Sequence, residues 1–142
     1  MKTARRQARE AALQALYAWQ LSGGDPLEEA RALPLGEGVD FSFVKSILDG
    51  VVGGAAGLEQ VIAPHLDRDF KRLSPVERAI LYIGAYELGA HPETPFKVVL
   101  NEAIELGKSY GGTEGHRFVN GVLEKVAAAL RPEEVARARK IA

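Results

Sequence analysis

Apolar residues recur at three- and four-residue steps along most of the chain, which is the spacing of amphipathic helices. No segment alternates between apolar and polar residues over the length of a strand. The first helix is predicted over about 4–21, with Leu13 and Leu16 on its apolar face. Thr3 is positioned to cap this helix, and the Gly-Gly-Asp-Pro turn at 23–26 ends it.

A short acidic helix is expected over 27–32, and Asp40 is positioned to cap a longer helix that reaches about residue 62. Glycine is unfavourable inside helices, yet this segment contains four of them: Gly50, Gly53, Gly54 and Gly57. Either the helix bends or breaks there, or the small residues let another helix pack closely. The second alternative is favoured.

The clearest helix start in the chain is Ser-Pro-Val-Glu at 74–77. It combines a capping serine, proline at the first helical position and glutamate three residues after the cap. Thr94 and Pro95 predict another helix start of the same kind. Thr113 is expected to cap the last major helix, and Pro132 begins a short basic tail helix.

Five substantial helices, one short acidic helix and a tail helix joined by short loops predict an all-α fold. We expect a compact bundle of about seven helices, with residues 1–142 forming one domain. The sequence shows no internal repeat and no low-complexity linker.

The composition is that of a soluble globular protein, with 46% hydrophobic and 26% charged residues. No apolar stretch approaches the roughly 18 residues of a membrane span, and no signal peptide is recognisable. The absence of cysteine excludes disulfides and thiolate zinc sites, and together these features predict a cytoplasmic protein. The net charge of −1 gives no global argument for nucleic acid.

The residues that carry chemistry are scattered. His65, His91 and His116 fall in three different segments, at no spacing that predicts metal ligation. Glu102 and Glu105 share a helix, but nothing nearby supplies a nucleophile, so a solvated or hydrogen-bonded helix face is the better interpretation. We therefore expect no catalytic residue, no metal and no cofactor: a binding protein, not an enzyme.

Charge is unevenly distributed along the chain. Residues 1–20 contain four basic side chains and one acidic, a balance of +3, whereas residues 25–40 contain five acidic and one basic, a balance of −4. Arg5, Arg6 and Arg9 lie in the first turns of a helix, where they repel one another and oppose the helix dipole. Because local stability gains nothing from them, a functional explanation is indicated. Guanidiniums suit RNA phosphates, and Tyr17 or Phe118 would offer a stacking surface for single-stranded RNA.

Five segments together resemble the NusB family of bacterial transcription antitermination factors, in order and over about residues 2–130. They are residues 6–20, 76–81, 86–88, 98–108 and 116–125. The most specific parts are LNEAIELGK at 100–108 followed by HRFVNGVLEK at 116–125.

The resemblance implies an all-α fold of two packed helical subdomains without enzymatic activity. It also implies pairing with NusE, a small-subunit ribosomal protein, and binding of boxA RNA in nascent ribosomal RNA transcripts. There the pair would help RNA polymerase resist termination.

Carried over to this chain, the resemblance assigns two sets of residues. The expected RNA contacts are Lys2, Arg5, Arg6, Arg9, Tyr17, Arg117 and Phe118, and the expected NusE contacts are Glu77 and Glu114. Neutralising the three arginines of the first helix is expected to weaken RNA binding without changing helicity. The chain departs from common family patterns at Gly112 and Gly115, which leave fewer side chains for a partner there.

Two alternatives stay open. A NusB-like domain also occurs at the N-terminus of ribosomal RNA cytosine methyltransferases, but this chain ends about ten residues past the bundle, so that hypothesis is disfavoured. The second alternative is a helical adaptor or homodimer without affinity for RNA.

Overall fold

The computed structural model describes residues 2–110 and 112–141, and at 112–114 and 141 it describes the backbone alone. Within these residues the chain forms seven α-helices and two short 3-10 turns, which confirms the all-α prediction. The helices are α1 (Ala4–Ser22), α2 (Pro26–Ala32), α3 (Phe41–Ile62), α4 (Pro75–Ala90), α5 (Phe96–Tyr110), α6 (Gly112–Leu130) and α7 (Pro132–Ile141). The turns are η1 (Ala63–His65) and η2 (Phe70–Arg72).

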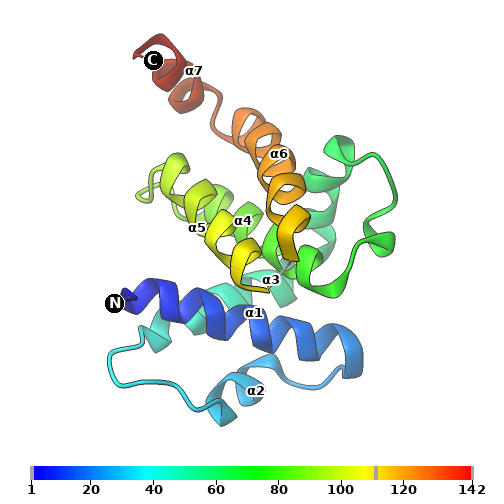
Figure 1. The fold of residues 1–142 in the computed structure, drawn as a ribbon, viewed down its shortest axis with the longest axis vertical. Coiled ribbons are helices and arrows are strands. Elements are labelled where there is room, and N and C mark those ends of the chain that lie inside the picture. The colour runs from blue at the N-terminus through cyan, green and yellow to red at the C-terminus, as the bar shows by residue number, and fades with distance from the viewer. Residues whose placement is uncertain (1, 111, 142) are drawn as a thin grey trace.

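Helix α4 is the central element of the bundle, because it packs against α1, α3, α5 and α6. Its residues 79–85 are all buried, as expected for a helix that is apolar on every side. Figure 1 shows α1 and α2 below α4, with α5 running beside α4 and α6 toward the upper right. Helix α7 projects at the top of this view and carries the C-terminus. The predicted two packed groups of helices are confirmed.

The starts of three helices follow their local sequence. The Thr3 hydroxyl accepts from the Arg6 amide at 3.0 Å, and the Asp40 carboxylate accepts from the Phe43 amide at 3.1 Å. At α4 the Ser74 hydroxyl accepts from the Glu77 amide while the Glu77 carboxylate accepts from the Ser74 amide, both at 3.1 Å. These caps confirm the predicted helix starts, because each involves only neighbouring residues.

The starts of α5 and α6 differ from the prediction. The first amide of α5, at Phe96, donates to Glu134 Oε2 of α7 at 2.8 Å, so its partner comes from a distant helix. Helix α6 begins at Gly112 and already includes Thr113, which therefore does not precede the helix as its cap. The cap supplied by α7 is a tertiary contact, and the pattern around Thr94 does not reveal it.

Arg131 attaches the junction of α6 and α7 to the end of α4. Its guanidinium is buried and donates to backbone carbonyl oxygens at the end of helix α4 and in the following loop. The acceptors are the carbonyl oxygens of Glu87, Leu88, His91 and Thr94, at 2.6 to 3.1 Å. One side chain thus caps a helix from another element, and nothing in the sequence around it identified it.

The glycines of α3 show both of the predicted effects, a bend in the helix and close packing by another helix, although only close packing was favoured. A Cβ on Gly50 would lie 2.0 Å from Cε1 of Tyr86, so this glycine lets α4 approach closely. Gly54 has non-helical backbone angles (φ −123°, ψ 18°) and marks a kink. Gly53, Gly54 and Gly57 have no neighbour within 4 Å of a Cβ position, so close packing does not account for them.

The segment Phe41–His65 is long and apolar enough to cross a membrane, by length and composition, with a mean hydropathy of 1.3. The expectation that no segment would reach that length was therefore wrong. The first half of α3 buries Phe43, Val44 and Ile47, and the helix packs on α1 and α4. Core helices of soluble proteins pass the same test; here 28% of the apolar window is buried.

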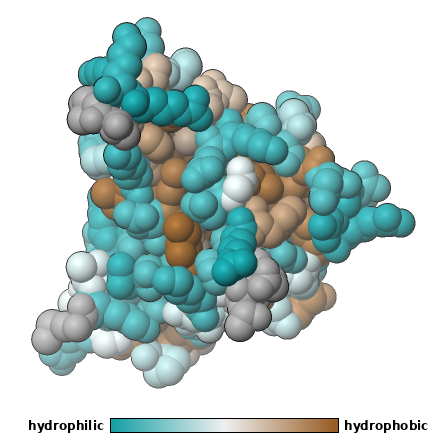
Figure 2. Space-filling view, turned by 45° about the horizontal axis from the view of Figure 1, so that its top comes forward, coloured by the Kyte–Doolittle hydropathy of each residue, from teal (hydrophilic) through white to brown (hydrophobic). Residues whose placement is uncertain are grey.

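The large apolar side chains that are exposed are spread over α1, α3, α5 and α6. On the face seen in Figure 2, hydrophobic residues form separate small areas among hydrophilic ones. Such scattered exposure is ordinary for a protein surface. The exposed residues are Tyr17, Leu21, Val52, Val98, Tyr110 and Leu130.

The two kinds of glycine in α3 give a matched test. Gly50→Ala should lower the free energy of unfolding by about 2 kcal/mol, because the new methyl overlaps the Tyr86 ring. Gly53→Ala should leave it unchanged or raise it by up to about 1 kcal/mol, because alanine favours the helix and open space surrounds the site. Urea unfolding followed by circular dichroism measures both. Equal effects would contradict the close contact between α3 and α4.

Candidate functional site

Arg9 of α1 is buried between two carboxylates. It is 3% exposed, and its Nε and Nη2 atoms donate to the two oxygens of Glu87 in α4, both at 2.8 Å. Its Nη1 atom donates to Glu102 Oε1 of α5 at 3.1 Å. The pairing with Glu87 is two-pronged, which is the geometry that arginine and carboxylate favour.

Arg6 shares Glu102 with Arg9. Arg6 Nη2 donates to Glu102 Oε2 at 2.6 Å, and this carboxylate raises the pKa of Arg6 above its ordinary value. Two guanidiniums and two carboxylates therefore form one charge-balanced cluster that joins α1, α4 and α5. We call Arg6, Arg9, Glu87 and Glu102 the ion cluster.

The ion cluster corrects one expectation and decides another. Arg9 is not part of an exposed basic patch. Of the two alternatives for Glu102, solvated or hydrogen-bonded, the structure shows the hydrogen-bonded one, in a buried position. The arginines that lack acidic neighbours within the first turn of α1 have carboxylate partners about 80 and 90 positions away. Local rules disfavour arginine in the first turns of a helix, but removing one partner of a buried ion pair costs far more than the small dipole term.

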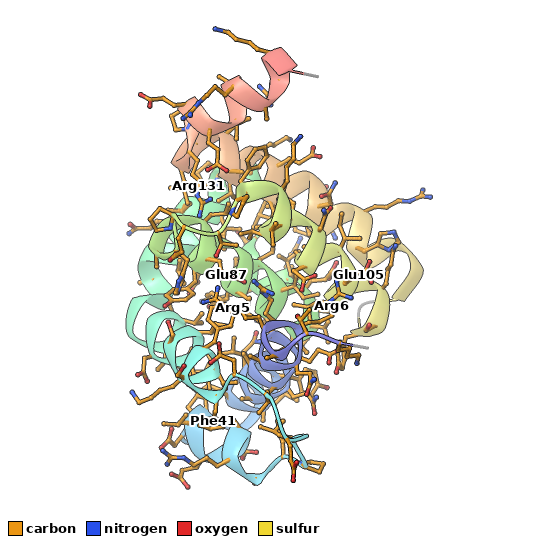
Figure 3. The ribbon with its side chains drawn as sticks, turned by 90° about the vertical axis from the view of Figure 1, so that its left-hand side faces the viewer. Arg5, Arg6, Phe41, Glu87, Glu105 and Arg131 are labelled. Carbon is orange, nitrogen blue, oxygen red and sulfur yellow. The ribbon has the colours of Figure 1, made fainter. Side chains whose placement is uncertain are left out.

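Arg5 and Arg6 point to different sides of α1, as Figure 3 shows. The Arg5 guanidinium lies over the Phe43 ring of α3, 4.2 Å from its centroid, and its Nε is 3.9 Å from Asp40. Arg9 lies between the other two arginines: it shares Glu102 with Arg6 and the Phe43 ring with Arg5.

Lys2, Arg5 and Arg6 remain partly accessible, with side chains 56%, 44% and 39% exposed. Lys2 folds back along α1, where its Nζ lies 2.7 Å from Glu10 Oε2, and this contact raises the pKa of Lys2. All three are cations at neutral pH. Each has an acidic neighbour that a ligand phosphate would have to displace or share.

Tyr17 extends the same face of α1. Arg6, Glu10, Gln14 and Tyr17 lie at steps of three and four residues, and Tyr17 is 41% exposed. Gln14 Nε2 donates to the Tyr110 hydroxyl at 3.3 Å, which places this face beside the end of α5. The structure therefore brings the basic start of α1 and an exposed aromatic ring onto one surface.

Arg117 and Phe118 lie in the first turns of α6, on the other side of the end of α5. A Cβ on Gly107 of α5 would lie 2.8 Å from the His116 Cα, so α6 begins tightly against α5. Arg117 is exposed and Phe118 is half-buried. The two predicted groups thus flank the last turns of α5.

The two residues expected to contact a protein partner give a different result. The Glu77 carboxylate is half-buried and accepts from the Ser74 amide, so it caps α4 whatever else it does. The side chain of Glu114 lies outside the described residues. Both assignments stay predictions.

The described residues contain no group of three or more His, Asp or Glu side chains that could hold a metal ion. The cavity beside the ion cluster has a volume of about 70 Å³, which is room for water rather than for a cofactor. It is lined by Lys2, Arg6, Glu10, Glu105 and their neighbours.

The model of the NusB family matches residues 6–128 of this sequence. The chain belongs to the NusB family. The transcription antitermination protein NusB of Dechloromonas aromatica is 50% identical, over 98% of this chain and 86% of that protein. The protein of the same name from Paraburkholderia phytofirmans is 47% identical, over 99% of both chains.

Solved structures of NusB proteins have the same fold. T. maritima NusB is 28% identical, with a TM-score of 0.83 over 96% of this chain and 99% of that chain. A crystal structure of the antitermination factors NusB and NusE in complex with dsRNA is also 28% identical, with a TM-score of 0.78 over 91% of this chain and 99% of that chain. The NusB-family chain is therefore a transcription antitermination protein and not an enzyme.

The ion cluster gives a stability prediction for this NusB-family protein. Arg9→Met should lower the free energy of unfolding by about 3 to 5 kcal/mol, because it leaves the buried Glu87 carboxylate without its cation. Arg5→Met, in the same turns of α1 but exposed, should cost less than about 1 kcal/mol. Urea unfolding of both variants measures the difference. A cost for Arg9→Met as small as that for Arg5→Met would contradict the structural role of the cluster.

Proposed function

We propose that this protein binds boxA RNA of nascent ribosomal RNA transcripts together with NusE, and so helps RNA polymerase resist termination. The observation that carries the proposal is the surface formed by the exposed cations of α1, Tyr17 and the start of α6. Cations suit the phosphates of an extended RNA, and exposed rings suit its unstacked bases. The solved NusB relative in complex with NusE and dsRNA supports the same class of ligand and partner.

The roles of the basic residues differ within this surface. Lys2 and Arg6 are accessible enough to meet phosphates, and Arg117 is exposed at the start of α6. Arg5 is also accessible, but on the other side of α1, so an RNA that meets it would have to cross the start of this helix. Arg9 is instead a positioning residue that holds α1 against α4 and α5. Neutralising all three arginines together would therefore disturb the fold as well as the ligand site, contrary to the expectation from sequence.

RNA binding by the protein alone should be weak. Glu10 pairs with Lys2, and Glu102 pairs with Arg6, so phosphates must compete with carboxylates already in place. We propose that NusE adds the missing affinity and that Glu77 and Glu114 lie toward it. The alternative of a homodimer without RNA affinity predicts no RNA binding under either condition.

We further propose that the ligand is single-stranded, because stacking on Tyr17 or Phe118 needs bases free of a duplex. Because it acts on nascent transcripts, we propose that the protein works in the cytoplasm. We also propose that residues 1–142 act as one domain.

Titration of labelled boxA RNA with and without NusE tests the function. NusE should strengthen RNA binding at least tenfold, and affinity should fall with salt at a slope of roughly −2 to −3 in log–log terms, because three or four cations meet phosphates. Fluorescence anisotropy at two salt concentrations measures both quantities. Absence of RNA binding in the presence of NusE would refute the proposed function.

The competing carboxylate gives a second test. Glu10→Gln should strengthen binding of boxA RNA about twofold to threefold, because it releases Lys2 and removes a negative charge from the surface. Glu29→Gln, on the exposed face of α2, makes the same charge change away from this surface and serves as the control. The two variants are compared by anisotropy at one salt concentration. An equal gain in both would show a general charge effect instead.

A further inference from the structure

Arg68 lies in the connection between η1 and η2, outside every group of residues considered so far. Its guanidinium carbon lies over the ring of Phe118 in α6, 5.2 Å from the ring centroid. Its side chain is 47% exposed, whereas the Phe118 ring is half-buried against the core. A flexible cation from one element thus covers an aromatic ring from another, at the outer edge of the proposed RNA surface.

Asp67 fixes the direction of this guanidinium. Arg68 Nε donates to Asp67 Oδ1 at 2.8 Å, and Arg68 Nη2 donates to Asp67 Oδ2 at 3.2 Å. These two bonds lie along the edge of the guanidinium fork, so they leave its flat faces uncovered by Asp67. The same contact raises the pKa of Arg68 and lowers that of Asp67, so both stay charged at neutral pH.

A guanidinium held at its edge and backed by a ring has the properties of a stacking platform. Arginine stacks on aromatic faces, including the faces of unpaired RNA bases, and a ring behind it adds cation–π attraction. Asp67 compensates the charge locally, so the platform would act by stacking more than by net charge. Arg117 is adjacent to Phe118 in sequence and exposed, and it supplies a cation for the neighbouring phosphate.

We propose that Arg68, layered on Phe118, is a stacking site for one unpaired base of the bound RNA. The inference rests on the proposed function and adds a residue from the η1–η2 connection to its surface. The RNA would then run from the cations of α1, past the end of α5, to the start of α6 and Arg68. A base stacked there would contact the exposed guanidinium, whose carbon lies 5.2 Å from the centroid of the Phe118 ring.

Substitution of Arg68 tests the stacking site with NusE and boxA RNA present. Arg68→Ala should weaken RNA binding about threefold to fivefold with little change in its salt slope, because a stacking contact is lost and not a phosphate contact. Arg68→Lys should weaken it nearly as much, since lysine keeps the charge but lacks the flat fork. Arg72→Ala, at an exposed arginine of the neighbouring turn η2, is the matched control and should have a smaller effect.

A double substitution isolates the contact with the ring. Phe118→Leu keeps an apolar side chain but removes the aromatic face, so adding Arg68→Ala to it should cost less than in the unmodified protein. A pre-annealed duplex of the same RNA should bind equally well with or without Arg68. Three outcomes would each overturn the stacking site. The losses of RNA affinity from Phe118→Leu and Arg68→Ala could add in full, Arg68→Ala and Arg72→Ala could cause equal losses, or Arg68→Ala could weaken duplex binding as much as single-stranded binding. If the unmodified protein binds RNA and the Arg68→Ala variant binds it as tightly, only the stacking site is refuted. If the unmodified protein does not bind RNA, the proposed function is refuted.

Discussion

The buried ion cluster of Arg6, Arg9, Glu87 and Glu102 is the interaction on which the arrangement of helices depends. It joins α1 to α4 and α5 inside an otherwise apolar core, with two positive and two negative groups. A buried carboxylate without its cation is costly, so α1 can dock in only one rotation and register about its axis. That rotation also decides which of its side chains reach the surface.

The ion cluster therefore links the fold to the proposed function. Because Arg9 and part of Arg6 are directed inward, Lys2, Arg5 and the outer edge of Arg6 remain for a ligand. The acidic partners of these cations balance them in the free protein. An RNA surface built in this way is attractive only where phosphates arrive at the right positions, or where a second protein adds contacts. The solved complex of a NusB relative with NusE and dsRNA agrees with such a dependence on a partner.

Contacts between residues close together in the sequence could be predicted, whereas contacts between residues far apart in the sequence could not. The caps at Thr3, Asp40 and Ser74 were predicted, because each involves residues within one helical turn. The cap of α5 by Glu134 and the anchoring of α4 by Arg131 were not, because their partners lie more than 30 positions away. The glycines of α3 show the same division. Their number indicated either a bend or a close contact, but only the position of Tyr86 assigns the contact to Gly50.

By itself, the sequence determined the all-α class, the order of the helices and, through its motifs, the NusB family, since helical periodicity and turn residues are local properties. It also located the basic start of α1 and the aromatic residues of the proposed RNA surface. Only the tertiary structure decided which of those arginines are buried. A charge on a helix surface is free or compensated according to what other helices place beside it, and Glu87 and Glu102 come from helices far along the chain. The placing of Arg68 over Phe118 was likewise decided by packing alone.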